Sequence, residues 1–305
     1  MKSRDLVDLF LLAAIWGSSF LFMRVTAPVF GPVALAFVRV AGAALLLLPL
    51  LFWRGEARAM ARQWPGLLVL GLCNSALPFM LFGYALLTLP AALSAIFNAA
   101  TPLATAVIAW AWLADKPTRW RAVGLVIGFA GVVGLALHKS LAHDYLHGLR
   151  GLQFDATAAL AIGACLLATL LYGYSANFAK RHLQGTPAMA MATGTQFAAA
   201  LVLALPALWS WPHTVTPSAT DWLMALTLAL LCSGVAYVLY FRLIRNVGPT
   251  QASAVTFLVP VFAALFGVGL LDEPVGPPML VGGAVIIAGT ALVLGLLPRP
   301  RARQA

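Results

Sequence analysis

Polar side chains recur at helical spacing within otherwise apolar stretches of the sequence. One series, at intervals of four, three and four residues, consists of Ser94, Asn98, Thr101 and Thr105. This spacing places the four side chains on one face of a helix. Hydrocarbon offers polar groups no hydrogen-bond partner, so in a membrane this face should line protein or a water-filled cavity. Pro102, which lacks a backbone donor, can leave a carbonyl group free toward the same cavity.

Further candidates for a polar path lie in other apolar stretches. They are Trp16, Ser19, Asn74, Tyr84, Tyr172, Asn177, Ser233, Tyr237 and Thr256, with Pro78 and Pro260 as candidate helix breaks. Each of these residues can instead have a purely structural role. A serine or threonine hydroxyl can donate to the carbonyl one turn back, an asparagine can make a hydrogen bond between helices worth roughly 0.6–2 kcal/mol, and a core tryptophan can donate to a backbone carbonyl.

A single arginine, Arg39, interrupts the apolar run ALAFVRVAGAALLLLPL at residues 34–50. In a helix that begins near Val33, Arg39 lies about 9 Å below that end. A long side chain can extend part of that distance toward water, so Arg39 can bind helix-end carbonyls and hold neighbouring helices together. Alternatively, its positive charge attracts the carboxylate of a substrate. Both interpretations stay open at this point.

The composition indicates the kind of elements that position these residues. Of 305 residues, 62% are hydrophobic and 9% are charged, and the mean hydropathy is +0.94, whereas a soluble domain carries about 25% charged residues. About 20 apolar residues in a helix cross a bilayer core. Ten such spans lie near 6–25, 33–53, 66–87, 91–113, 120–137, 157–178, 188–208, 222–243, 251–271 and 279–297.

Charge and cysteine usage narrow the class further. The net charge of +10 is spread over short loops, which argues against a nucleic-acid partner because that requires a concentrated basic face. The three cysteines lie in apolar stretches, so no disulfide framework is expected. Loops taken alternately carry fifteen lysines and arginines on one side and three on the other. Because basic residues near span ends stay on the cytoplasmic side, both termini are predicted to be cytoplasmic.

Residues 89–137 and 247–294 resemble each other at an offset of 158 positions. The matches are Pro102 with Pro260, Val123-Gly124 with Val281-Gly282, Ala130-Gly131 with Ala288-Gly289, and DKP at 115–117 with DEP at 272–274 after a slip of one residue. The fronts of the halves agree more faintly, in Gly17 with Gly173 and Arg24 with Lys180. Five spans per repeat is an odd number, so the second repeat should enter the membrane from the opposite side. Inverted repeats are typical of transporters that rock about a site near the midplane.

With this repeat, the sequence resembles paired EamA domains of the drug/metabolite transporter superfamily. The resemblance lies in WGSSFLFMRV at 16–25, an arginine in the second span, and a proline followed by a DxP hinge and a glycine-rich fifth span. It covers essentially the whole chain and implies a ten-helix inner-membrane carrier that exports, or less often imports, small metabolites such as amino acids. It also implies that the first four spans of each repeat surround the path. The second repeat departs from the pattern, with YGYSANF at 172–178 and Gln196 roughly where the first has Arg39.

Acidic groups and histidines do not fall in the middle of any span. An intramembrane carboxylate relay for protons therefore has no carrier, and intramembrane catalysis has no nucleophile–base pair or metal cluster. His143 and His147, four residues apart, can share a metal ion, but no cysteine or carboxylate set completes a site around them. We expect no catalytic residue, no metal and no cofactor. Transport is expected to proceed by exchange or uniport, or by coupling through groups that the sequence does not identify.

We therefore predict an all-α polytopic membrane protein of ten transmembrane helices in two inverted five-helix repeats. The first repeat spans 1–137, an external linker 138–156, and the second repeat 157–305 with a short basic tail. The predicted function is a bacterial inner-membrane carrier of small metabolites, with export of amino-acid-like solutes by alternating access as the leading hypothesis. A multidrug or lipid-intermediate flippase of the same fold is the alternative. Predicted partners are a small-molecule substrate and the lipid bilayer, and the glycine-rich spans 120–137 and 279–297 are candidate homodimer surfaces.

Overall fold

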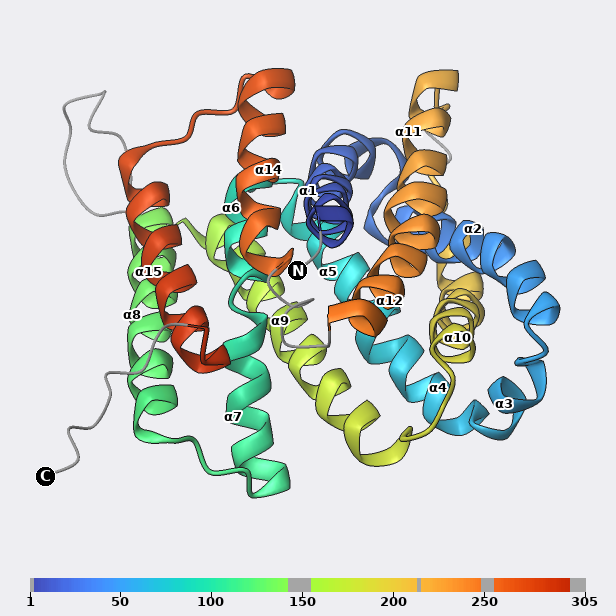
Figure 1. Ribbon diagram of the computed structural model, residues 1–305. Helices are drawn as coiled ribbons and strands as arrows, with labels where there is room; N and C mark the ends of the chain where they lie inside the picture. The colour runs from blue at the N-terminus through green and yellow to red at the C-terminus, as the bar shows by residue number, and fades with distance from the viewer. Residues whose placement is uncertain (1–2, 142–154, 213–214, 248–254, 297–305) are drawn as a thin grey trace, which may run out of the picture.

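The computed structural model describes residues 3–141, 155–212, 215–247 and 255–296. His143 and His147, most of the predicted linker and the basic tail lie outside these ranges. Within them, all regular structure is α-helical apart from two short π-helical segments (Figure 1).

The helices follow the predicted spans closely. In chain order they are α1 (Ser3–Phe30), α2 (Pro32–Trp53), α3 (Ala57–Arg62), α4 (Trp64–Gly71), η1 (Leu72–Ala76), α5 (Leu77–Ala85), α6 (Ala91–Asn98), α7 (Thr101–Leu113), α8 (Arg119–Leu141), α9 (Ala156–His182), α10 (Ala188–Trp209), α11 (Ala219–Ala229), η2 (Leu230–Val235), α12 (Ala236–Val247), α14 (Val255–Leu271) and α15 (Pro277–Leu294). In the described ranges, nine helical spans are long and apolar enough to cross a membrane, and α14 is a shorter apolar helix. The prediction of an all-helical polytopic membrane protein with about ten helices is confirmed. Only the short helix α3 was not expected.

Turn and capping residues explain where several helices begin and end. Gly31 has a φ of 75°, a left-handed conformation that glycine adopts without steric cost, and Pro32 then opens α2 where its missing N–H is not needed. The carboxylate of Asp155 caps α9 by accepting hydrogen bonds from the backbone N–H groups of Thr157 and Ala158. The Thr157 hydroxyl, which also donates to this carboxylate, is the main reason that the pKa of Asp155 is lowered.

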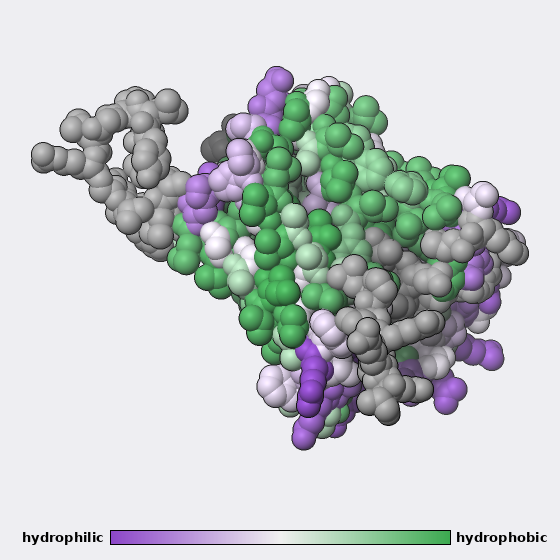
Figure 2. Space-filling model, turned by 60° about the vertical axis from the view of Figure 1, so that its left-hand side comes forward, coloured by the Kyte–Doolittle hydropathy of each residue, from purple (hydrophilic) through white to green (hydrophobic). Residues whose placement is uncertain are grey.

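The outer surface of the bundle is apolar over a broad face. Figure 2 shows this hydrophobic face, with hydrophilic residues gathered toward its upper and lower edges. Exposed apolar side chains on the outer helices include Val126 of α8, Leu265 of α14 and Val281 of α15. An exposed apolar surface of this extent is typical of a protein that contacts lipid.

Glycines join α8 to α15 within the monomer. A Cβ atom added to Gly289 would lie 2.4 Å from the backbone nitrogen of Gly128, and one added to Gly124 would lie 2.7 Å from the carbonyl oxygen of Gly289. Small residues of this kind let two helix backbones approach closely in a membrane. The glycine faces that were candidate homodimer surfaces are therefore covered by an intramolecular contact. A homodimer stays a prediction, and it would have to use the outward faces of these helices.

The two halves of the chain repeat the same helix contacts. Gly17 of α1 packs against α14, where an added Cβ would lie 2.6 Å from the Cβ of Phe262. Gly173 of α9 packs against α7, where an added Cβ would lie 2.8 Å from the Thr105 nitrogen. Gly173 lies 156 positions after Gly17, the spacing that the sequence matches at the front of each half predict.

The ends of α7 and α14 are also equivalent. Ala114 and Asp272, separated by 158 positions, both adopt left-handed φ angles of 55° and 52°. The next residue then donates its N–H back into the helix, from Asp115 to the Ala109 carbonyl at 3.2 Å and from Glu273 to the Gly267 carbonyl at 3.0 Å. Asp115 is thus the counterpart of Glu273 at the same offset of 158, without the slip that the DKP and DEP motifs suggested. These two hinges, α7–α8 and α14–α15, lie at opposite ends of the bundle (Figure 1).

Candidate functional site

A cavity of about 310 Å³ lies within the bundle. It is lined by Trp16, Ser19, Phe20, Met23, Arg39, Asn74, Phe79, Phe82, Asn98, Thr101, Tyr172, Ala176, Cys232, Tyr237, Tyr240, Thr256 and Val259. These residues come from α1, α2, the η1–α5 and α6–α7 segments, α9, the η2–α12 segment and α14. Among the described residues, α8, α10 and α15 contribute nothing to the lining.

Irregular helical turns lie at this cavity in both halves. Pro78 has no N–H for the carbonyl four residues earlier, and just before it the chain widens into η1, where the Leu77 N–H donates to the Leu72 carbonyl. The segment η2 starts 158 positions after η1 and ends the same way, with the N–H of its C-cap residue donating five residues back. Such π-helical turns are rare and occur frequently at functional sites. They carry Asn74 and Cys232, which line the cavity.

The Arg39 guanidinium group is buried in the cavity wall, with 5% of the residue exposed. Its Nε donates to Ser233 Oγ at 2.8 Å, and its Nη1 lies 3.3 Å from Met23 Sδ. Its central carbon lies 3.7 Å from the centre of the Phe79 ring, a cation–π contact. The described residues that line the cavity include no carboxylate. The structural interpretation of Arg39 assumed helix-end carbonyls as its partners, and the structure places a hydroxyl, a sulfur atom and an aromatic ring there instead.

Gln196 of α10 makes the equivalent contact in the other half. It is fully buried, and its Nε2 donates to Ser75 Oγ at 3.2 Å. Ser75 and Ser233 are separated by 158 positions and lie in η1 and η2. The pairs Arg39–Ser233 and Gln196–Ser75 are therefore the same contact in the two repeats. This geometry supports Gln196 as the counterpart of Arg39, so the cation is present in one repeat only.

The structure brings together most of the predicted path residues. Nine of them line the cavity: Trp16, Ser19, Arg39, Asn74, Asn98, Thr101, Tyr172, Tyr237 and Thr256. Several also make the local bonds that were their structural alternatives, since the Ser19 hydroxyl donates to the Trp16 carbonyl at 2.7 Å and the Thr101 hydroxyl to the Asn98 carbonyl at 2.7 Å.

Three predicted residues lie elsewhere. Ser233 is not part of the lining, and its hydroxyl oxygen accepts a hydrogen bond from Arg39 Nε. Asn177 is buried and donates to the Thr105 carbonyl at 3.0 Å and the Gly173 carbonyl at 2.8 Å, so it joins α9 to α7. Tyr84 is 42% exposed and is not part of the lining.

The three prolines predicted as helix breaks have different surroundings. Pro78 follows η1 and Pro102 opens α7 after the interruption between α6 and α7. Pro260 lies inside the continuous helix α14 and is buried. The two breaks in the first half therefore lie next to lining residues, whereas Pro260 does not end a helix.

Four aromatic residues of the lining, Phe20, Phe79, Phe82 and Tyr240, were not predicted. The three phenylalanines carry no polar signal in an apolar span, so only the fold reveals that they face the cavity, whereas Tyr240 has a hydroxyl group but was not among the predicted residues. The Tyr240 ring lies 5.2 Å from that of Trp16, and the Phe82 ring stacks on Tyr172 at 6.2 Å. The described lining that contains Arg39 therefore includes seven aromatic side chains.

Ion pairs lock both ends of α1, and the sequence did not reveal them. Arg24 Nε lies 3.1 Å from Glu273 Oε1, which belongs to the α14–α15 hinge. We call the end of the bundle that contains this pair the Arg24 end. At the other end of α1, Asp8 pairs with Arg242 of α12, and the Asp5 carboxylate accepts a hydrogen bond from Asn246 at 3.0 Å. These groups were expected in loops or at span ends, where nothing in the sequence shows which distant residues meet.

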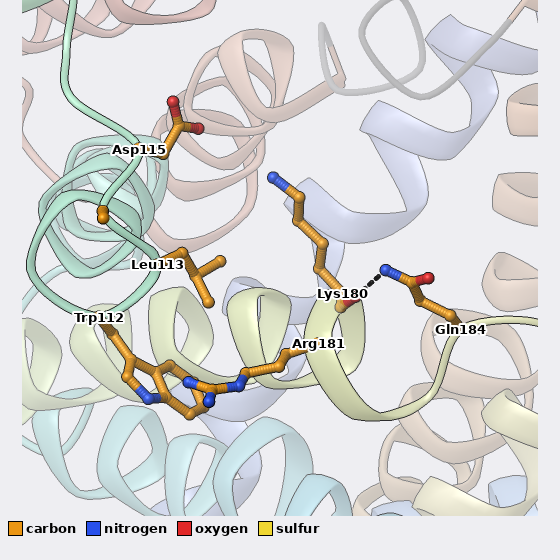
Figure 3. A pocket seen from close by; sticks show the side chains of 7 residues that line it. Trp112, Leu113, Asp115, Lys180, Arg181 and Gln184 are labelled. Atoms are coloured by element: carbon orange, nitrogen blue, oxygen red, sulfur yellow. Dashed lines mark hydrogen bonds between the residues drawn. The ribbon is translucent and has the colours of Figure 1, made fainter.

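A second hollow, of about 550 Å³, opens between the ends of α7 and α9, at the end opposite Arg24. We call it the α7–α9 groove; it is lined by Trp112, Leu113, Ala114, Asp115, Lys180, Arg181 and Gln184 (Figure 3). The Arg181 guanidinium lies 5.2 Å from the centre of the Trp112 ring, and Gln184 Nε2 donates to the Lys180 carbonyl at 2.7 Å.

Comparison with known proteins identifies the family. The model of the EamA-like transporter family matches residues 6–137 and 159–295. An "Uncharacterized transporter" of Archaeoglobus fulgidus is 29% identical over 96% of this chain and 98% of its own. The inner membrane transporter YedA of Escherichia coli K12 is 27% identical over 97% and 94%. A "Probable terminal-alkyne amino-acid exporter" of Streptantibioticus cattleyicolor is 24% identical over 95% and 93%. A crystal structure with 18% identity has the same fold, with a TM-score of 0.64 over 97% of this chain and 98% of its own. The chain therefore belongs to the EamA-like transporter family and is a multi-pass membrane transporter, not an enzyme.

Proposed function

We propose that the protein is an inner-membrane secondary carrier that exports small amphipathic solutes with a carboxylate group, of the amino-acid type. The observation that carries the proposal is the lining of the central cavity. It combines one buried cation, Arg39, with an aromatic wall and, among the described residues, no carboxylate.

The charge of Arg39 favours an anionic group in the ligand. Burying a cation without a counter-ion costs several kcal/mol in effective terms, and the contacts with Ser233, Met23 and Phe79 compensate only in part. A guanidinium group has five N–H donors, more than those contacts use. A carboxylate in the cavity would accept from the remaining donors in the geometry that arginine provides.

The rest of the lining favours a small amphipathic ligand. A cavity of about 310 Å³ is at the lower end of the roughly 300–1,000 Å³ found for small-molecule sites, which favours a metabolite over a lipid. Asn74 and Asn98 supply amide oxygens, acceptors that an ammonium group requires. The relative named as a probable amino-acid exporter adds support for this class.

We also propose that the two repeats are inserted in opposite orientations, with both termini cytoplasmic, and that they alternate access to the cavity. Support comes from the charge distribution along the loops and from the repeated contacts of Gly17 with α14 and of Gly173 with α7. The path residues are those that line the cavity, and Ser233 and Asn177 hold their helices in place. In this orientation Arg39 lies toward the outer face, as its position in α2 predicts.

A thermal-stability screen of the purified protein tests this proposal. Amino acids, nucleobases, sugars and cationic drugs are compared, and each stabilising acid is paired with its uncharged amide. We expect carboxylates with an apolar body to raise the unfolding temperature, and their amides to raise it less. Stabilisation by cationic drugs alone would overturn the proposal in favour of a multidrug carrier.

A further inference from the structure

Three elements meet at the Arg24 end and close it. Arg24 Nε bonds to Glu273 Oε1 at 3.1 Å, and its Nη1 donates to the carbonyls of Leu86 and Leu87 at 2.6 and 3.1 Å. Glu273 Oε2 accepts from the Ala91 N–H at the start of α6 at 2.8 Å. The pair therefore fastens α1 and the α14–α15 hinge to the connection between α5 and α6. Glu273 is only 11% exposed in this arrangement.

The repeat defines the counterpart of this pair. Asp115 corresponds to Glu273 because both follow a left-handed residue and donate their N–H to equivalent carbonyls. Lys180 corresponds to Arg24 at the spacing of 156 that also relates Gly17 to Gly173. The counterpart of Arg24–Glu273 is thus Lys180–Asp115, at the opposite end of the bundle.

This second pair is not formed. Asp115 and Lys180 lie on opposite walls of the α7–α9 groove, with no ion pair or hydrogen bond between these two described side chains (Figure 3). Arg181, the neighbouring cation, is held against the Trp112 ring, whereas the Lys180 side chain extends into the groove. The Arg24–Glu273 pair is therefore formed, and the equivalent Lys180–Asp115 pair at the other end is open, although Asp8 and Arg242 join α1 to α12 at that end.

Each of these basic residues is coupled to the cavity through its own helix. Trp16 lies eight residues before Arg24 on α1, and Tyr172 lies eight residues before Lys180 on α9. Both aromatic residues line the cavity. At 1.5 Å per residue, each basic residue is about 12 Å along the helix from the lining, so a tilt of either helix changes the gate and the cavity together.

We propose that Arg24–Glu273 and Lys180–Asp115 are the two alternating gates of the carrier. The structure shows the state in which the first is closed and the second open. In the opposite state, Lys180 and Asp115 pair across the groove while Arg24 and Glu273 separate. This inference rests on the proposed function, because only a carrier with alternating access requires two exclusive gates.

Distance measurements between spin labels test the gates without any solute. Labels are attached at Ala114→Cys and Gln184→Cys, which line the groove and leave Asp115 and Lys180 intact, after replacement of Cys73, Cys165 and Cys232 by alanine. A second pair, Leu87→Cys and Pro274→Cys, reports on the Arg24 end. Glu273→Gln then removes the charge that closes that end. Asp272→Asn, in the same hinge, is the matched control, because it removes an exposed carboxylate that makes no ion pair among the described residues.

We expect Glu273→Gln to shift the main distance across the groove to shorter values and to lengthen the distance at the Arg24 end, while Asp272→Asn changes neither. Adding Lys180→Gln to Glu273→Gln should abolish the shorter groove distance. An unchanged groove distance in Glu273→Gln, or a short one that persists without Lys180, would overturn the inference. The distance measurements need no ligand. If the groove distance shortens and the distance at the Arg24 end lengthens, but no carboxylate is transported, the proposed substrate class is refuted and the two gates are still supported. Transport without any such shift would refute the gates alone.

Discussion

Replacing Arg39 by glutamine removes the single charged side chain from the described lining of the cavity. A guanidinium group can give a carboxylate two charge-assisted hydrogen bonds worth roughly 1.5–3 kcal/mol each, whereas a glutamine amide can retain one such bond to the charged acceptor. The expected loss of binding free energy is therefore at least about 1.5 kcal/mol, which raises the dissociation constant roughly 10-fold or more. Glutamine is the residue that the second repeat carries in the equivalent contact, so the fold accepts it there.

Titration calorimetry with a stabilising carboxylate solute measures this effect on purified protein. Arg39→Lys keeps the charge but loses the planar fork, so its affinity should fall between those of the wild type and Arg39→Gln. Gln196→Met changes the equivalent buried position in the other repeat and should leave the affinity within about three-fold, because Gln196 is not part of the described lining of the cavity. Size-exclusion chromatography establishes that each variant is folded.

The reasoning fails if folded Arg39→Gln binds the carboxylate solute as tightly as the wild type. It also fails if Gln196→Met weakens binding as much as Arg39→Gln does, because the two repeats would then contribute alike. If Arg39→Gln and Arg39→Lys both fail to accumulate as folded protein, Arg39 is required for the fold, and the structural interpretation of its contacts with Ser233 and Phe79 replaces the functional one.

Gly289→Ala should destabilise the protein by about 1–3 kcal/mol through overpacking, because the added Cβ would lie 2.4 Å from the Gly128 nitrogen. Gly134→Ala should leave the stability unchanged, because an added Cβ there has nothing within 4 Å. Thermal unfolding of the two variants checks this difference. Ser233→Ala should weaken carboxylate binding by about 1 kcal/mol, or roughly five-fold, because Arg39 loses the 2.8 Å hydrogen bond that positions it. Calorimetry measures the change in affinity, and an unaltered affinity would show that Ser233 does not position Arg39. The lowered pKa of Asp155 contributes stability above its unfolded-state pKa, and that contribution is lost as the pH falls through the folded-state value. The unfolding temperatures of wild type and Asp155→Asn should therefore differ at neutral pH and converge in acid, and a constant difference across this range would contradict the assignment.

The helices could be predicted because the thickness of the bilayer imposes their length and hydropathy. α2, for example, was expected at 33–53 and lies at Pro32–Trp53. The polar half of the cavity was also accessible, since a side chain such as Asn98 is costly in lipid and must face inward. The equivalence of the halves was visible in Gly17 and Gly173, whose packing on α14 and α7 explains why only glycine fits there.

Contacts between distant residues could not be predicted in the same way. Phe79 is one of many apolar residues in its span, and only the fold shows that its ring lies 3.7 Å from the charge of Arg39. Glu273 was assigned to the DEP turn between two spans, and its partner Arg24 is 249 residues away in sequence. The π-helical turns likewise leave no periodic signal, since one extra residue in a turn does not change the composition of the span.

Solute counterflow in proteoliposomes tests the central claim most directly. Vesicles that contain the wild-type protein are loaded with an unlabelled carboxylate solute from the stability screen, and entry of the labelled solute is followed against that of its labelled amide. The account predicts transient accumulation of the carboxylate, little of the amide, and loss of both in folded Arg39→Gln. Equal accumulation of carboxylate and amide, or transport that is unaltered in Arg39→Gln, would contradict it.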